Sequence, residues 1–155
     1  MKIGIIVNSK SGHTLQAAEV LKQKLAARGL DVRLERVSAY DESPMDKGSV
    51  KLKSAPDISG YDTLVVCAWV MGGTLCPAMN TYLSGNNNLS GKTAVCMITH
   101  AFPFKSWGGT QTLNQTERLL ESKGALVKGG GIVNWMGFGR KSRIDSVAEW
   151  TAGLI

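Results

Sequence analysis

The stretch Ile3-Gly-Ile-Ile-Val7-Asn8-Ser-Lys-Ser-Gly-His-Thr14 decides the fold, because it joins an apolar, strand-like run to a helix-like segment through a hydroxyl-rich loop. We expect a buried strand over residues 2–7. We expect a helix over residues 14–28, since apolar side chains recur there at helical spacing and Gly29 can end it. The hydroxyls of the loop therefore lie at the start of a helix.

This junction is suited to bind a phosphate group. The first N–H groups of a helix have no intrahelical partner, and the helix dipole adds partial positive charge there. Gly12 lets the backbone approach a ligand closely, and the hydroxyls of Ser9, Ser11 and Thr14 surround it. The sequence therefore predicts a phosphorylated small molecule as the ligand.

Other interpretations of this loop fit less well. A Walker loop needs Gly-x4-Gly-Lys-Ser/Thr, and residues 8–14 contain no Gly-Lys pair. The segment from Gly85 to Thr93 has one residue too many and precedes a strand, so we interpret it as a turn. A dinucleotide loop needs three glycines, whereas residues 8–14 contain one. An ordinary Ser/Thr helix cap needs only one hydroxyl, so we favour a monophosphate loop.

The composition is typical of one globular domain over residues 1–155. The chain has 43% hydrophobic and 19% charged residues, as folded proteins do, and it is long enough for one core. No apolar run approaches the roughly 18 residues that cross a membrane, and the N-terminus lacks the apolar core of a signal peptide. We therefore expect a cytoplasmic protein without a membrane span; no oligomeric state is predicted.

Cysteine and charge content exclude several classes of function. The three cysteines show neither a disulfide framework nor the spacing of zinc ligands, so no metal site is predicted. Cys67 and Cys96 lie in apolar runs and are expected in the core, whereas Cys76 lies in a loop and is expected to be partly exposed. The net charge of +6 allows an acidic partner. The cations are scattered and not interleaved with aromatic residues, which argues against nucleic-acid binding.

The rest of the chain alternates between strand and helix patterns. Strands are expected over residues 31–37, 62–69, 92–99 and 125–134, and helices over residues 77–83, 110–123 and 143–152, the last capped by Ser142. Residues 38–57 are expected to be irregular, and Gly129–Gly131 to mark a bulge or close packing. The alternation predicts an α/β three-layer sandwich around a five-stranded parallel sheet of order 2-1-3-4-5. Loops 8–14, 70–77 and 100–109 then meet at the carboxyl edge of the sheet, where ligands bind.

Three of these loops resemble those of the flavodoxin-like family, and the likeness covers nearly the whole chain. Ser9-Lys-Ser-Gly-His-Thr14 is similar to that family's loop for the phosphate of FMN. Val70-Met-Gly-Gly-Thr74 is similar to the loop beside the flavin ring, and Met71-Gly72 stands where many flavodoxins have a glycine peptide near the reactive flavin nitrogen. His100-Ala-Phe-Pro-Phe-Lys-Ser-Trp-Gly-Gly109 occupies the place of the second ring-holding loop.

The resemblance implies FMN as cofactor and a set of residues that bind it. The phosphate would be held by the hydroxyls of Ser9, Ser11 and Thr14 and by the N–H groups of Lys10, Gly12 and His13. The ring would stack on Trp69, Phe102, Phe104 or Trp107, and the backbone of Gly72 and Gly73 would approach its edge. Val70, Met71, His100, Ala101, Gly108 and Gly109 complete the two ring loops.

The implied function is that of an FMN-binding redox protein that transfers electrons between a reductase and an acceptor, with no catalytic side chain of its own. The segment Trp107-Gly-Gly-Thr-Gln-Thr-Leu113 also resembles flavodoxin-like quinone reductases, so an FMN-dependent NAD(P)H:quinone oxidoreductase is the alternative. Those reductases usually carry a histidine where this chain has Trp107, and electron-carrier flavodoxins are usually acidic, whereas this chain is basic. A non-redox module that binds an acidic partner is the third possibility.

Overall fold

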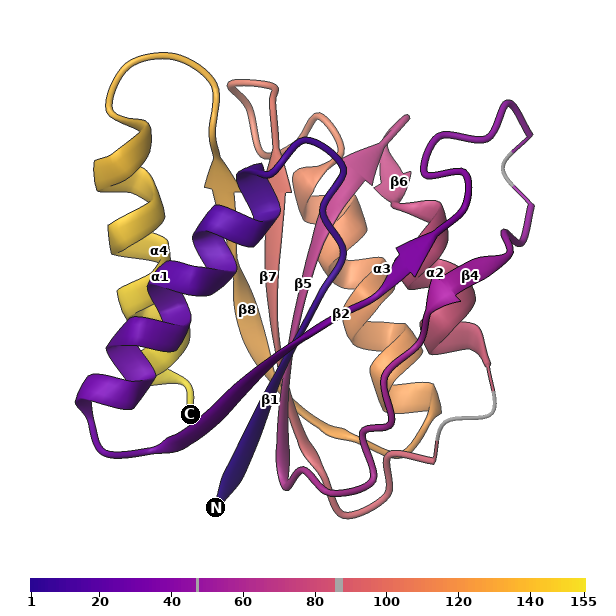
Figure 1. The fold of residues 1–155 in the computed structure, drawn as a ribbon. Helices are drawn as coiled ribbons and strands as arrows, with labels where there is room; N and C mark the ends of the chain where they lie inside the picture. The colour runs from indigo at the N-terminus through magenta and orange to yellow at the C-terminus, as the bar shows by residue number, and fades with distance from the viewer. Residues whose placement is uncertain (47, 86–87) are drawn as a thin grey trace.

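Five parallel strands form the central sheet of the computed structural model, which describes residues 1–46, 48–85 and 88–155 (Figure 1). In spatial order they are β2 (Asp31–Arg36), β1 (Lys2–Val7), β5 (Thr63–Met71), β7 (Thr93–His100) and β8 (Leu126–Asn134). Every neighbouring pair in this path is parallel. The predicted order 2-1-3-4-5 is therefore confirmed.

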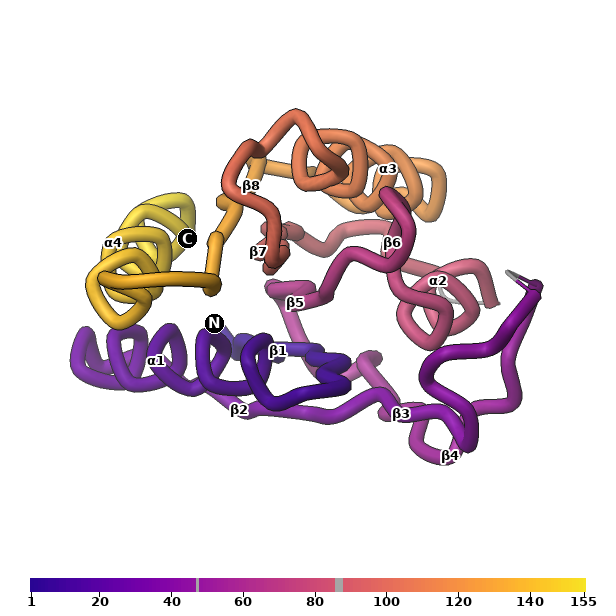
Figure 2. The backbone as a smooth tube through the Cα atoms, turned by 90° about the horizontal axis from the view of Figure 1, so that it is seen from above, coloured from indigo at the N-terminus to yellow at the C-terminus, as the bar shows by residue number. Residues whose placement is uncertain are grey.

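Helices cover both faces of the sheet and make the predicted three layers. Helices α1 (His13–Ala27) and α4 (Arg140–Gly153) lie on one face, and α2 (Pro77–Ser84) and α3 (Gly109–Ser122) lie on the other (Figure 2). Within the described part of the chain, no helix combines the length and the apolar character needed to cross a membrane.

Alternate side chains of the strands supply two cores. On β1, Ile3 and Ile5 are buried with residues of α1 and α4, whereas Ile6 is buried with Met79 of α2 and Leu120 of α3. Each such aliphatic side chain contributes about 1.5–3 kcal/mol when fully buried. Because helices cover both faces, the inner strands are apolar almost throughout, as parallel strands are.

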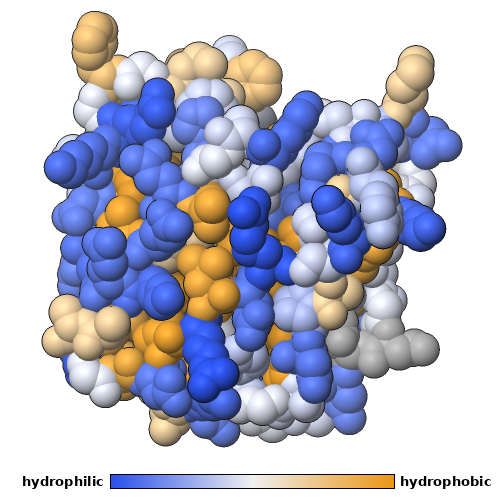
Figure 3. Space-filling model, viewed as in Figure 1, coloured by the Kyte–Doolittle hydropathy of each residue, from blue (hydrophilic) through white to orange (hydrophobic). Residues whose placement is uncertain are grey.

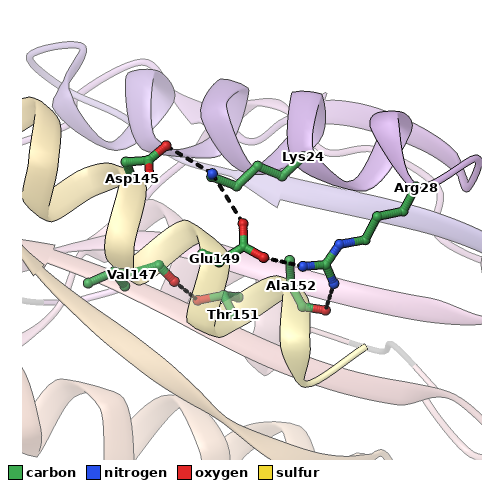
Figure 4. Close-up of polar contacts among 7 residues, drawn as sticks. All are labelled: Lys24, Arg28, Asp145, Val147, Glu149, Thr151 and Ala152. Carbon is green, nitrogen blue, oxygen red and sulfur yellow. Dashed lines mark hydrogen bonds and ion pairs between the residues drawn. The ribbon is translucent and has the colours of Figure 1, made fainter.

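Ion pairs join the two helices of one face. Lys24 of α1 lies 2.9 Å from a carboxylate oxygen of Asp145 and 3.2 Å from one of Glu149, both on α4 (Figure 4). Arg28 pairs with Glu149 and donates a hydrogen bond of 3.0 Å to the carbonyl of Ala152. The Lys24 hydrogen bond, assisted by Arg28, lowers the pKa of Glu149 below its ordinary value. The two carboxylates are exposed and Lys24 is only partly buried, so these ion pairs contribute little to the stability of the fold.

Two connections contain more regular structure than the sequence predicted. Strand β5 continues to Met71 and folds back into β6 (Thr74–Leu75), which pairs with it antiparallel. Gly72 and Gly73 form this tight turn with φ of 56° and 80°, a left-handed backbone conformation that residues other than glycine rarely adopt. The connection over residues 38–57 contains a short antiparallel pair, β3 (Ser38–Ala39) and β4 (Leu52–Ser54).

Two side-chain predictions were wrong. Helix α4 begins at Arg140 after Gly139, so Ser142 lies inside it and does not cap it. Cys76 is fully buried, because it precedes Pro77 at the start of α2 and packs in the core. Burial raises the pKa of this thiol to about 12. The predicted turn over residues 85–93 is described only in part, since residues 86–87 lie outside the described residues.

The glycine run in β8 is explained by close packing, as predicted. The register between β7 and β8 shifts between Ala94 and Cys96, and Gly129 has a φ of 111°. A Cβ atom on Gly130 would lie 2.4 Å from the carbonyl oxygen of Cys96, and one on Gly131 would lie 2.6 Å from Val147. Side chains at these positions would push β8 away from β7 and α4.

Candidate functional site

The hydroxyl loop (residues 8–14) leads into α1 without a side-chain cap. Gly12, with φ of 92°, is the N-cap residue, and no side chain accepts a bond from the first turn. Instead, Ser9 Oγ accepts the Gly12 N–H at 3.1 Å, and Ser11 Oγ lies 2.7 Å from His13 Nδ1. The ordinary Ser/Thr cap is therefore excluded, and the start of α1 remains a site of positive potential.

Thr14 joins the start of α1 to the end of β7. Its hydroxyl is 2% exposed and lies 2.7 Å from the hydroxyl of Thr99, which is equally buried. This bond fixes the distance between the hydroxyl loop and the loop after β7. A hydrogen bond from Thr14 to a phosphate remains a prediction.

A cavity of about 300 Å³ opens where the loops after β1, β5, β7 and β8 meet. Its lining residues are Lys10, Ser11, His13, Thr14, Trp69, Val70, Thr99, His100, Ala101 and Trp135. The structure thus brings together eight of the residues predicted from the sequence and adds two, Thr99 and Trp135. Its size is at the lower end of the range for small-molecule sites.

Trp69, at the end of β5, forms one aromatic wall of the cavity. Its indole N–H donates to Asn8 Oδ1 at 2.8 Å. Asn8 is fully buried and in turn donates to the Val37 carbonyl at 3.0 Å and to Glu42 at 3.1 Å. The Lys10 ammonium lies 5.9 Å from the centre of the Trp69 ring, in cation–π range. Trp69 is therefore held in place at the wall while part of its ring stays accessible.

Trp135 forms a second aromatic wall, which the sequence analysis missed. It follows β8 and stacks on His13 with ring centres 3.7 Å apart and planes 6° apart. Arg140 lies 5.9 Å from the centre of the Trp135 ring and donates to its carbonyl at 2.7 Å. Burial, together with the charge of Arg140, lowers the pKa of His13. The available signal was the strand order, which puts the end of β8 at the same edge as the hydroxyl loop.

His100, the last residue of β7, lies deep in the cavity wall. It is 2% exposed, and neither ring nitrogen has a hydrogen-bond partner among the described residues. Its carbonyl accepts the N–H of Trp135 at 3.2 Å, which fixes its backbone. Burial lowers the pKa of His100, and the nearby Lys105 lowers it further.

The other predicted site residues surround the cavity but do not line it. They are Ser9, Gly12, Met71, Gly72, Gly73, Phe102, Phe104, Trp107, Gly108 and Gly109. Phe102, Phe104 and Trp107 are all more than half exposed, and Trp107 makes edge contacts with both phenylalanines. Their stacking on a flavin remains a prediction.

The two predicted ring loops touch each other. A Cβ atom on Gly108 would lie 3.0 Å from the Gly73 Cα and 3.1 Å from the Val70 side chain. Gly108 also has a φ of 107°. Both this backbone conformation and the close contacts therefore disfavour a side chain at this position. Glycine at this position lets the loop after β7 pack directly on the β5–β6 turn.

The edge around the cavity is cationic and partly apolar. Residues 8–18, 68–84, 99–116 and 134–144, which lie around it, contain no Asp or Glu; Glu42 of the connection after β2 contacts this edge through its hydrogen bond with Asn8. Lys10, Lys105, Arg140 and Lys141 are exposed there, and hydrophobic side chains project along the top edge of the molecule (Figure 3). Such an edge favours an anionic ligand or partner.

Comparisons with known proteins identify the fold. No family model and no curated protein matches the sequence. Among solved structures, the chain is similar to the flavodoxin of Streptococcus pneumoniae TIGR4, with 21% identity, a TM-score of 0.70 and full coverage of both chains. It is also similar to oxidised flavodoxin 2 of Bacillus cereus, with 19% identity, a TM-score of 0.71 and full coverage of both chains. Oxidised flavodoxin 1 of Bacillus cereus has 17% identity and a TM-score of 0.72, over 99% of this chain and 97% of that one. The protein has a flavodoxin-like fold.

Proposed function

We propose that the protein binds FMN and transfers electrons between a reductase and an acceptor. The observation that carries this proposal is the uncapped hydroxyl loop at the start of α1, which opens into a cavity with aromatic walls. One end of this cavity suits an anion and the other a flat ring, as a phosphorylated flavin requires. The similarity to solved flavodoxins supports the same cofactor.

The residues of the cavity fit FMN. The phosphate would be held by the hydroxyls of Ser9, Ser11 and Thr14 and by N–H groups at the start of α1. Trp69 and Trp135 would bound the cofactor, and the two ring loops would enclose the isoalloxazine. The side chain of His100 forms part of the cavity wall at the end of β7. When bound, the flavin itself supplies the redox chemistry.

An absorption spectrum of the purified protein tests the proposal, followed by titration of flavin-free protein with FMN and riboflavin. Two charge-assisted hydrogen bonds of about 1.5 kcal/mol each would favour FMN over riboflavin by roughly 100-fold. Ser11→Ala should reduce this preference, whereas Ser146→Ala on α4 should leave it unchanged. Protein that is colourless and remains so after incubation with FMN would contradict the proposal.

An NAD(P)H:quinone oxidoreductase is the second candidate. The exposed cations Lys10, Lys105 and Arg140 around the cavity favour it, because a nicotinamide nucleotide carries several negative charges. Rapid oxidation of NAD(P)H in the presence of a quinone would support the reductase. A well-populated one-electron-reduced flavin without such turnover would support the carrier.

Two further parts of the proposal concern partners and location. Salt-sensitive binding of an acidic protein by the flavin-free chain would favour a binding module instead.

The three cysteines are unpaired and buried, as expected for a protein of the reducing cytoplasm.

A further inference from the structure

The loop over residues 135–139, between β8 and α4, holds hydrophobic side chains out into solvent. Met136 is 54% exposed and Phe138 is 102% exposed. A phenylalanine exposed to this degree makes almost no contact with the rest of the protein. Its transfer from water to an apolar environment would be favourable, so this loop has an apolar surface that the fold itself does not use.

The loop is braced from within by two arginines of α4. Arg143 donates hydrogen bonds to three carbonyls: those of Asn134 and Met136, both at 2.7 Å, and that of Phe138. Arg140 Nε donates to the carbonyl of Trp135 at 2.7 Å. Four backbone acceptors between residues 134 and 138 are therefore satisfied by the protein itself. Since an unpaired carbonyl is costly outside water, a loop built in this way can enter an apolar environment.

The loop after β7 presents a second group of exposed rings beside the first. They are those of Phe102, Phe104 and Trp107, each more than half exposed. The Trp107 N–H donates to the Phe104 carbonyl at 3.0 Å, and these two rings pack edge to face with centres 4.9 Å apart. Because the Trp135 N–H donates to the His100 carbonyl at 3.2 Å, the two loops leave the sheet side by side. Together their exposed side chains form an apolar rim, whose members are Phe102, Phe104, Trp107, Met136 and Phe138.

The apolar rim is accompanied by cations. Residues 99–116 and 134–144 contain no Asp or Glu. The exposed cations are Lys105 in the first loop and Arg140 and Lys141 directly after the second. The rim therefore suits a partner that is apolar and negatively charged at the same place.

The acidic side chains of the same edge lie at its other end. The connection between β2 and β5 holds Asp41, Glu42 and Asp46, and Figure 1 shows this connection on the side of the molecule away from α4. Glu42 bonds to Asn8 after β1, which is two strands away from β7. These carboxylates therefore do not cancel the positive charge of the rim.

We propose that the apolar rim docks the protein on the surface of a membrane with anionic headgroups. Aromatic side chains are favoured at the boundary between water and lipid. Insertion of apolar groups and attraction of cations to anionic lipids both strengthen such binding. A bilayer suits this surface better than a folded protein does, because protruding tips can enter a soft interface without matching pockets.

Docking by the rim also orients the cavity. Ala101 and Trp135 belong to the same two loops and line the cavity. The mouth of the cavity would therefore face the lipid surface. The docking itself uses only side chains outside the cavity, so it requires no bound flavin.

Co-sedimentation of the purified protein with lipid vesicles tests the proposal. We expect binding to vesicles of phosphatidylcholine and phosphatidylglycerol mixed two to one, and much weaker binding to phosphatidylcholine alone. The double variant Met136→Ser/Phe138→Ser keeps the net charge and should bind at least roughly tenfold more weakly. Leu126→Ser is the matched control, because Leu126 is 66% exposed but begins β8, at the opposite edge of the sheet. It should bind like the wild type, and both variants should keep the wild-type circular dichroism spectrum.

A second pair of variants tests the cations. Lys141→Gln should weaken binding to the mixed vesicles by about fivefold, as expected for a lysine near an anionic membrane. Lys128→Gln makes the same change of charge in β8, away from the rim, and should have a smaller effect.

Two results would overturn the proposal. The first is equal binding by the wild type and by Met136→Ser/Phe138→Ser, because net charge alone would then explain the attraction. The second is a wild type that does not bind the mixed vesicles, even if the rim binds an acidic protein instead. These measurements use the protein with or without flavin, so a failure to bind FMN would refute the proposed function and leave membrane docking intact.

Discussion

Replacing Thr14 by valine tests how the hydroxyl loop is attached to the sheet. Valine has the shape of threonine, so the change removes a hydroxyl and little else. The hydroxyl of Thr99 lies 2.7 Å from that of Thr14, and Thr99 is only 1% exposed. In the variant, this buried hydroxyl loses its partner. An unsatisfied buried hydroxyl costs about 1–3 kcal/mol. For a protein of this size, 2 kcal/mol corresponds to a fall in Tm of roughly 4–8 °C.

A double-mutant cycle separates this pairing from other effects. Thr99→Val should cost about as much as Thr14→Val, whereas the double variant should be close to the wild type, because replacing both partners by apolar groups is nearly neutral. With about 2 kcal/mol lost in each single variant and almost none in the double variant, the coupling energy from urea unfolding of flavin-free protein should be about 4 kcal/mol. Strictly additive single variants would refute the reasoning. If Thr14 also binds the phosphate, Thr14→Val should weaken FMN binding more than Thr99→Val does.

Three further predictions concern packing, reactivity and pH. Gly130→Ala should lower stability by roughly 3 kcal/mol in thermal unfolding, because its Cβ would lie 2.4 Å from a backbone oxygen of β7; Gly153→Ala, with open space around its Cβ, should be neutral or slightly stabilising. Cys76 should resist alkylation at pH 8 in the native protein and react after unfolding, as mass spectrometry can show; fast labelling of the native protein would contradict its burial. Because Lys24 lowers the pKa of Glu149 in the folded protein, the stability from this pair is present above about pH 4.5 and is lost as pH falls through the folded-state value. Glu149→Gln should therefore lower stability more at pH 7 than at pH 3, and an equal loss at both pH values would contradict this.

Most of the fold could be predicted from the sequence because each element has a local signal. The apolar runs at residues 2–7 and 92–99 predict buried strands, and the glycines after α1 and α3 mark helix ends. Short elements such as β3 and β6 have no such signal, since two residues are too few to show a period. They form because neighbouring strands and glycine turns bring their backbones together.

Site residues could be predicted where residues close together in the sequence form the site. They could not be predicted where tertiary packing brings distant segments together. The hydroxyl loop and the ends of β5 and β7 were found because strand–loop–helix order places them at one edge. Trp135 was missed because only the position of β8 beside β7 brings it to His13, a contact between distant segments. The exposure of Phe102 and the burial of Cys76 also depend on tertiary packing, which the composition of a loop does not specify.

Asn8 couples one wall of the cavity to a distant part of the chain. Its amide group is hydrogen-bonded to Trp69 on one side and to Glu42 and the Val37 carbonyl on the other. A displacement of Val37 or Glu42 would therefore reach the indole of Trp69 through the hydrogen bonds of Asn8. By thermodynamic reciprocity, a cofactor that fixes this indole would in turn favour the observed positions of Val37 and Glu42. A docked redox protein that touched only Glu42 and its neighbours would thus alter how tightly the cofactor is held, without contacting it.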